Sequence, residues 1–204
     1  MKFVEALKQK GAPFIIPDCS RSELPQFFKD IGYEVGAEIG AHKAEFTAEF
    51  CEVGLEMFVI DPWIGFSGQG RHQKEQAVQD DYFRIAMNNL EPYDKYRVLR
   101  KTSMDALEDV KDGSLGFIYI DGNHNFRHAA ADIFEWSKKV KTGGIVAGHD
   151  YFDTASHARN VVCNVKAVLD AYTKAFDIDN WYIYKPDKPK NANDKVYSWL
   201  FIKK

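Results

Sequence analysis

Acidic residues stand at the ends of two apolar runs in the first third of the chain. Glu38 and Gly40 close the run YEVGAEIG, and Asp61 closes the run EMFVID. In nucleotide-binding α/β proteins, a carboxylate roughly 20 positions beyond such a glycine turn holds the hydroxyls of a ribose. The glycine itself lets a ligand come close to the backbone. These three residues therefore predict a site for a ligand that contains a nucleoside.

The loop after Gly40 lacks the further glycines that a pyrophosphate needs. A dinucleotide site shows G-x-G-x-x-G, whereas this loop has Ala41 and Ala44 where glycine is expected. Glu38 would repel a pyrophosphate but attract the ammonium group of an amino acid. The loop therefore favours adenosine joined to an amino acid over NAD. An NAD-dependent oxidoreductase stays an alternative that NADH binding would distinguish.

A second group of chemical residues follows two later apolar runs. Asp121 ends LGFIYID, and His149 with Asp150 ends GGIVAGHD. A hydroxyl that attacks another molecule needs a general base or a metal ion that lowers its pKa. Asp121 and Asp150, with an imidazole or waters, suit Mg²⁺ or another divalent cation such as Mn²⁺. Without a metal, His149 or His124 is the candidate base, because histidine titrates near neutral pH.

Each of these side chains also has a structural interpretation. His124 could cap a helix that begins near Phe126, and Asp150 could cap the helix after it. His149 could do no more than hydrogen-bond its own loop. His42, in the glycine loop, is expected to be exposed rather than catalytic.

The elements that position these residues alternate in type. Near-continuous apolar runs indicate strands buried on both faces, as in a parallel sheet. Helix-like segments lie between them, and the runs WYIYK and VYSWLFIKK flank a Pro/Lys-rich loop, so they predict an antiparallel pair of final strands. The sequence therefore predicts an α/β fold, a doubly wound Rossmann-like sheet with helices on both faces.

We expect residues 1–204 to form one domain. Residues 1–30 are expected to be an N-terminal helical extension, and residues 62–95 a flap and helix over the site. Trp63 either covers the adenosine or packs in the core. Tyr151 and Phe152 either line an acceptor pocket or pack in the core.

The composition excludes several classes of protein. The 204 residues carry a net charge of −3 and show no basic patch with interleaved aromatics, which disfavours nucleic acid as a partner. No run approaches the roughly 20 apolar residues of a membrane span. Three scattered cysteines suit a reducing, cytoplasmic location. The N-terminal segment and the final hairpin offer surfaces for a homodimer.

Four short motifs occur in one order in the middle of the chain. They are I-D-G-x-H at 120–124, D-I-x-x-W at 132–136, G-G at 143–144 and H-D-Y at 149–151. Over residues 33–152 this arrangement resembles the class I S-adenosylmethionine-dependent methyltransferases. The similarity is greatest to the branch of macrocin-type O-methyltransferases, which act on small molecules. The resemblance implies a seven-stranded, mostly parallel sheet whose last strand is antiparallel.

The resemblance also implies S-adenosylmethionine as the cofactor and assigns residues to its parts. Glu38 and Gly40 border the methionine part, and Asp61 holds the ribose. Ser103 and Met104 lie along the adenine. Such an enzyme aligns an acceptor with the methyl group and excludes water, and it needs no protein nucleophile.

At the sulfonium end of the cofactor the resemblance places Asp121. Relatives in this branch often bind Mg²⁺ with acids at such positions, and His149 replaces one of those acids here. Ala44 is a further departure, because many relatives have glycine there. The expected function is O-methylation of a small hydroxylated molecule. A protein that binds S-adenosylmethionine without catalysis is the other alternative.

Overall fold

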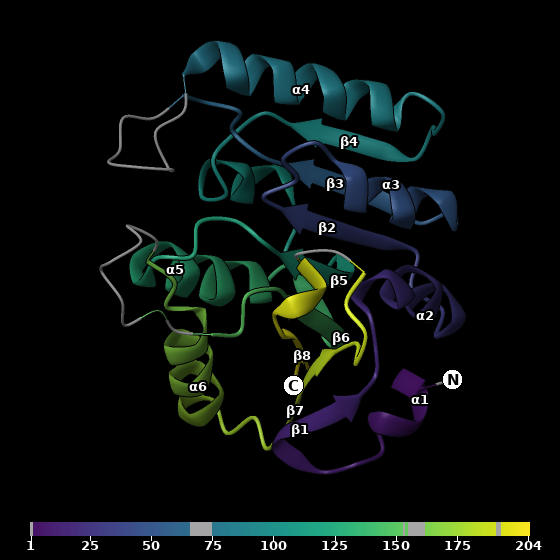
Figure 1. Ribbon diagram of the computed structural model, residues 1–204, viewed down its shortest axis with the longest axis vertical. Coiled ribbons are helices and arrows are strands. Elements are labelled where there is room, and N and C mark those ends of the chain that lie inside the picture. Colours follow the sequence, from purple (N-terminus) through teal and green to yellow (C-terminus); the bar gives the residue numbers. More distant parts are fainter. Residues whose placement is uncertain (1, 66–74, 153, 155–161, 191–192) are drawn as a thin grey trace.

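A single mixed sheet forms the centre of the computed structural model, which describes residues 2–65, 75–152, 154, 162–190 and 193–204. Within these ranges eight strands lie in the order β1-β7-β8-β6-β5-β2-β3-β4 (Figure 1). The strands are β1 (Gly11–Pro17), β2 (Val35–Ile39), β3 (Glu56–Ile60), β4 (Tyr96–Leu99), β5 (Leu115–Ile120), β6 (Val140–Gly148), β7 (Asn180–Lys185) and β8 (Ser198–Ile202).

All neighbouring strands pair in parallel except where β8 is involved. β8 runs antiparallel to both β6 and β7, so the hairpin predicted at the end of the chain is confirmed. The central strand β5 is buried at every position, as expected for a strand covered on both faces. The predicted α/β Rossmann-like fold with an antiparallel last strand is therefore confirmed.

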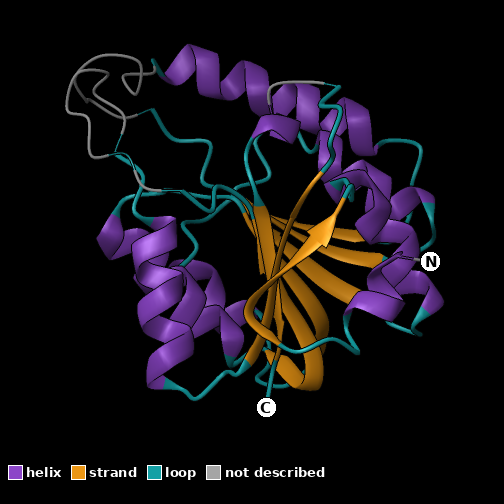
Figure 2. Ribbon diagram, turned by 60° about the horizontal axis from the view of Figure 1, so that its bottom comes forward, coloured by secondary structure: helices purple, strands orange, loops and turns teal. Residues whose placement is uncertain are grey.

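Helices cover both faces of this sheet (Figure 2). On one face α1–α4 pack through aromatic side chains such as Phe28 and Phe50, and on the other α5, α6 and the 3₁₀ helix η3 pack through Trp136 and Leu169. The helices are α1 (Lys2–Ala6), η1 (Arg21–Glu23), α2 (Leu24–Asp30), α3 (Glu45–Glu52), α4 (Gln76–Leu90), η3 (Asp105–Asp109), α5 (Phe126–Ser137), α6 (Val165–Ala175) and η5 (Asn193–Lys195).

The N-terminal segment differs from the expected helical extension. Its helices α1 and α2 flank a strand, β1, which pairs in parallel with β7 and places Ile15 opposite Ile183. This strand is the eighth, where the resemblance implied seven. Prolines at positions 13 and 17 suit an edge strand, which needs a neighbour on one side only. The two prolines interrupt the local strand pattern, and pairing with β7 decides its structure.

The predicted flap falls largely on residues 66–74, which lie outside the described residues, and it stays a prediction. Trp63, just before them, is fully buried and packs edge-on against Phe83 with 5.0 Å between ring centroids. Its core interpretation is therefore the correct one. Within the described ranges, no helix combines the length and apolar character needed to cross a bilayer.

The ends of β2 and β5 meet through their backbones. Gly40 has φ +85°, and a Cβ built on it would lie 2.3 Å from the carbonyl oxygen of Asp121. The N–H of Asp121 donates to the carbonyl of Ile39 at 2.8 Å, and the N–H of Gly40 donates to the carbonyl of Ile60 at 2.8 Å. Position 40 therefore requires glycine for its conformation and for its space.

Substitution of two glycines separates these requirements. Gly143 has φ +79° but open space around its Cα, so Gly143→Ala should cost only the left-handed conformation, about 1–2 kcal/mol. Gly40→Ala adds a clash with backbone, so it should lower the free energy of unfolding by about 1–3 kcal/mol more. Urea denaturation of both variants measures the difference. Equal losses would show that the close approach to Asp121 has no energetic role.

Candidate active site

Three adjacent parallel strands bring the predicted residues to one edge of the sheet. β5 lies between β2 and β6, so Asp121, which follows β5, stands between the ends of the other two. Glu38 and Gly40 come from the end of β2, and His149 and Asp150 follow β6. The expectation that these strand ends are neighbours is confirmed.

An imidazole lies between two carboxylates at this edge. His124 Nε2 is 3.4 Å from Asp121 Oδ1 and 3.1 Å from Asp150 Oδ2. One donor atom from each of the three residues lies within 4.8 Å of the others. We name Asp121, His124 and Asp150 the acid–histidine cluster. The N-cap residues of α5 and α6 are Asn125 and Asn164, so His124 and Asp150 do not cap these two helices.

Opposite charges shift the pKa values in this cluster. Burial lowers the pKa of His124, but the nearby carboxylates of Asp121 and Asp150 outweigh it and raise that pKa. Burial raises the pKa of Asp121, but His124, His149 and Arg21 outweigh it, so the pKa of Asp121 lies below its usual value. These shifts favour an ionised Asp121 beside a protonated His124.

His149 lies behind the cluster. Its side chain is buried, and Nδ1 is 3.2 Å from Asp150 Oδ1. Its backbone is held on both sides: the N–H donates to the carbonyl of Ile120, and the carbonyl accepts from Trp199 Nε1 at 2.9 Å. This arrangement favours a role in orienting Asp150, and a direct catalytic role for His149 stays a prediction.

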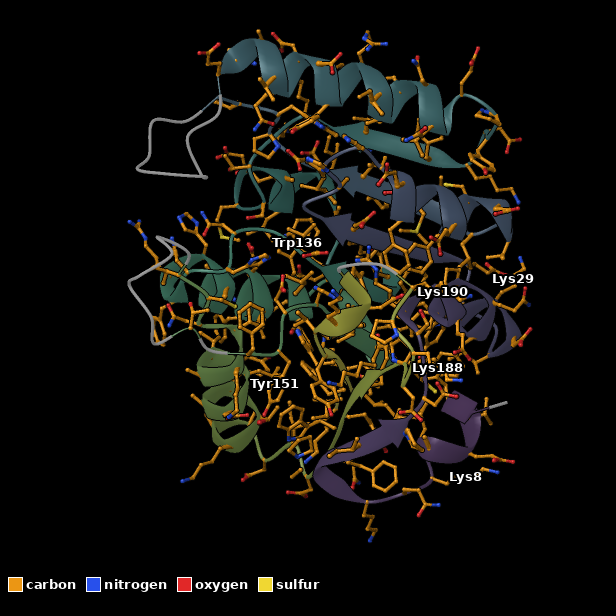
Figure 3. The ribbon with its side chains drawn as sticks, viewed as in Figure 1. Lys8, Lys29, Trp136, Tyr151, Lys188 and Lys190 are labelled. Carbon is orange, nitrogen blue, oxygen red and sulfur yellow. The ribbon has the colours of Figure 1, made fainter. Side chains whose placement is uncertain are left out.

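Tyr151 faces α6. Its hydroxyl donates to Asp170 of α6 at 2.8 Å, and its ring packs edge-on against Trp181. Figure 3 labels Tyr151 beside α6. Phe152 is partly buried against the same core. The interpretation of these two side chains as core residues is therefore favoured over an acceptor pocket.

The carboxylate of Asp61 ties the glycine loop to the end of β3. One oxygen accepts from the N–H of His42 and the other from the N–H of Trp63, each at 2.9 Å. His42 is exposed, as expected, and has φ +52°. Ala44 has φ +54°, the conformation that glycine adopts at lower cost. Since a carboxylate oxygen accepts more than one hydrogen bond, Asp61 retains acceptor capacity for ribose hydroxyls.

Glu38 is almost fully buried and accepts a hydrogen bond from the Thr47 hydroxyl of α3. Burial raises the pKa of Glu38 to about 8, although the Thr47 hydrogen bond lowers it. Without a ligand this carboxyl therefore holds a proton at neutral pH. An ammonium group beside it would favour its ionised form.

The loop with Ser103 and Met104 is held by α5. Trp136 Nε1 donates to the carbonyl of Ser103 at 3.1 Å, and Figure 3 labels this tryptophan on the face of the sheet that α5 covers. Asp132, one turn earlier, lies near the Ser103 side chain, and burial raises the pKa of Asp132 to about 6. The D-I-x-x-W motif therefore positions the segment expected along the adenine.

Arg21 is a site residue that the sequence did not indicate. It belongs to η1 in the N-terminal segment, and its Nη1 lies 3.3 Å from Asp121 Oδ2. The guanidinium lies 4.8 Å from the centroid of the Phe46 ring. An isolated arginine 100 positions from Asp121 carries no local signal. The nearest one is the Ser20–Glu23 capping box, which predicts a helical turn but no function.

Glu38→Gln should stabilise the ligand-free protein in a pH-dependent way. The unfolded chain loses the Glu38 proton above about pH 4.5, whereas the folded protein keeps it up to about pH 8. The wild type therefore loses stability across that window, and Gln does not. The variant should gain under about 1 kcal/mol at pH 5 and about 2–3 kcal/mol at pH 7. Denaturant unfolding at both pH values measures this, and a gain independent of pH would contradict the buried, protonated state of Glu38.

Solved structures with this fold include several methyltransferases. The O-methyltransferase from Bacillus cereus, in complex with SAH, superposes with a TM-score of 0.60 at 16% identity, over 91% of this chain and 83% of that one. The N-methyltransferase NodS from Bradyrhizobium japonicum gives 0.61 at 12% identity, over 90% and 94%. The tRNA (m1A58) methyltransferase TrmI from Aquifex aeolicus gives 0.61 at 13%, over 90% and 68%. At such identities these likenesses establish the fold alone.

Sequence comparison gives the family. The uncharacterized protein y4gI of Sinorhizobium fredii is 30% identical over 99 residues, which are 48% of this chain. The matched part spans only 10% of that relative's length. The family described as "Methyltransferase domain" matches residues 33–151, which contain the glycine loop and the acid–histidine cluster. The chain therefore belongs to this family of methyltransferase domains.

Proposed function

We propose that this chain transfers the methyl group of S-adenosylmethionine to a hydroxyl of a small molecule, as the macrocin-type branch does. One observation carries the proposal. Asp121 touches the cofactor loop through its backbone at Gly40, and its carboxylate belongs to the acid–histidine cluster. A ligand on the loop is thereby adjacent to groups that bind and deprotonate a hydroxyl.

The proposed cofactor lies along the strand ends. Its amino-acid part is at Glu38 and Gly40, its ribose at Asp61, and its adenine beside Ser103 and Met104. The support is that Asp61 shapes the loop while keeping acceptor capacity, and that Ser103 is held from behind by Trp136. The protein's own hydrogen bonds thus hold both the glycine loop and the segment with Ser103 and Met104.

A divalent cation fits the acid–histidine cluster. Two carboxylate oxygens and an imidazole nitrogen within 4.8 Å form a donor set that suits Mn²⁺ and, with waters, Mg²⁺. Asp121, Asp150 and His124 would hold the ion. When bound, the ion would lower the pKa of the acceptor hydroxyl.

The same cluster supports a route without metal. In its neutral form His124 would take the hydroxyl proton at Nε2, and Asp121 and Asp150 would stabilise the imidazolium that forms. His149 would keep Asp150 oriented. An experiment has to distinguish the metal-dependent route from the metal-free one.

The alternatives differ in their support. The NAD-dependent oxidoreductase is disfavoured, because the matched family consists of methyltransferase domains. A non-catalytic S-adenosylmethionine-binding protein is distinguished by turnover. The net charge of −3 favours a small molecule over nucleic acid as acceptor. The single-domain organisation, the cytoplasmic location and the homodimer stay predictions.

Cofactor binding is tested by calorimetric titration with S-adenosylhomocysteine, the demethylated cofactor. We expect micromolar affinity and no heat with NADH under the same conditions. Asp61→Ala should weaken the affinity at least about tenfold, because charge-assisted hydrogen bonds to the ribose are lost. Binding of NADH without binding of S-adenosylhomocysteine would contradict the proposal.

The cluster is tested by methyl transfer from labelled S-adenosylmethionine to a panel of hydroxylated small molecules. Asp150→Asn should lower turnover by about 100-fold or more while affinity for S-adenosylhomocysteine changes less than about threefold. Asp109→Asn is the matched control, since Asp109 is similarly buried and ion-paired but lies outside the cluster.

Chelation then separates the two routes. Loss of activity in EDTA, restored by Mn²⁺ or Mg²⁺, supports the cation. Activity that survives EDTA and falls in His124→Gln supports the histidine base. A fully active Asp150→Asn variant would refute the role of the cluster.

A further inference from the structure

Arg21 reaches the site from outside the part of the chain that matches the family. It precedes residues 33–151 and lies in η1, whose start is fixed by a capping box. Glu23 Oε1 accepts from the N–H of Ser20 at 3.0 Å, and Ser20 Oγ accepts from the N–H of Ser22 at 3.3 Å. The following residue, Leu24, is fully buried at the start of α2. The backbone around Arg21 is therefore anchored.

The guanidinium is supported on one side and open on another. Its face lies over the Phe46 ring, and its Nη1 lies 3.3 Å from Asp121. Its side chain is 18% exposed, so solvent or a ligand reaches part of it. A guanidinium carries five N–H donors in a planar fork, and the bond to Asp121 uses one edge of that fork.

The position of Arg21 relates it to the cofactor loop. It lies over Phe46 in the first turn of α3 and beside Asp121, so it is close to the end of β2 where the amino-acid part of the cofactor is proposed. An amino acid presents an ammonium and a carboxylate. Glu38 suits the ammonium, and a planar cation nearby suits the carboxylate.

We propose that Arg21 binds the carboxylate of the amino-acid part of S-adenosylmethionine. This inference rests on the proposed function and adds a binding residue to it. Arg21 keeps one nitrogen on Asp121 and offers its remaining donors to the ligand. It thereby links the carboxylate of the cofactor to Asp121, at the methyl-transfer end of the site.

Two ligands that differ only in the amino-acid part test the inference. S-adenosylhomocysteine has that part, and 5′-methylthioadenosine lacks it. Arg21→Gln should weaken binding of S-adenosylhomocysteine by about tenfold or more and change binding of 5′-methylthioadenosine by less than about twofold. Arg84→Gln is the control, because Arg84 is an exposed, ion-paired arginine on α4, and it should change neither affinity.

The outcomes are distinct. Equal losses for both ligands in Arg21→Gln would assign Arg21 a structural role and overturn the inference, as would no loss for either. If Arg21→Gln does not fold, Arg21→Lys is judged with the same two ligands and should lose about threefold or more for S-adenosylhomocysteine alone. If the wild-type protein binds neither ligand, the proposed function itself is overturned. If the wild-type protein binds both ligands and Arg21→Gln weakens both equally or neither, only the role of Arg21 is overturned.

Discussion

The close approach of Gly40 to the carbonyl of Asp121 joins the two halves of the site. Parallel strands of an open sheet end at one edge, and β2 and β5 are neighbours there. Because position 40 has no side chain, the cofactor loop lies directly against the strand that carries Asp121. Every other arrangement in the site depends on this contact: the loop held by Asp61, the cluster with His124 and Asp150, and the contact with Arg21.

The charges of the site are balanced in the free protein by protonation and by pairing. Glu38 holds a proton because it is buried, whereas Asp121 is ionised because two histidines and Arg21 surround it. Buried Glu38 and half-buried Asp121, on adjacent strands, thus have pKa values shifted in opposite directions. Such a separation is typical of sites where one group meets a ligand charge and another acts on a proton. It also means that Glu38 costs folding stability near neutral pH, a common feature of binding sites.

The N-terminal segment lies outside the part of the chain that matches the family, and it contributes to both the sheet and the site. It adds β1 to the edge of the sheet and brings Arg21 to the centre of the site. Structures with the same fold include methyltransferases named for oxygen, nitrogen and tRNA, so the shared sheet does not select the acceptor. Selection therefore has to come from residues around the sheet, and η1 is one such element that lies outside the family match.

The sequence by itself indicated the central strands of the sheet and the acids at their ends. Glu38, Asp61, Asp121 and Asp150 each end an apolar run, and parallel strands necessarily bring such ends to one edge. Tertiary structure alone decided three things: the pairing of β1, the burial of Trp63, and the contact of Arg21 with Asp121 across 100 positions. Tertiary structure also places His124, and not His149, between the two carboxylates. The reason is physical: strand ends follow from local hydrophobic patterns, whereas these contacts depend on which distant segments pack together, and no local pattern records that.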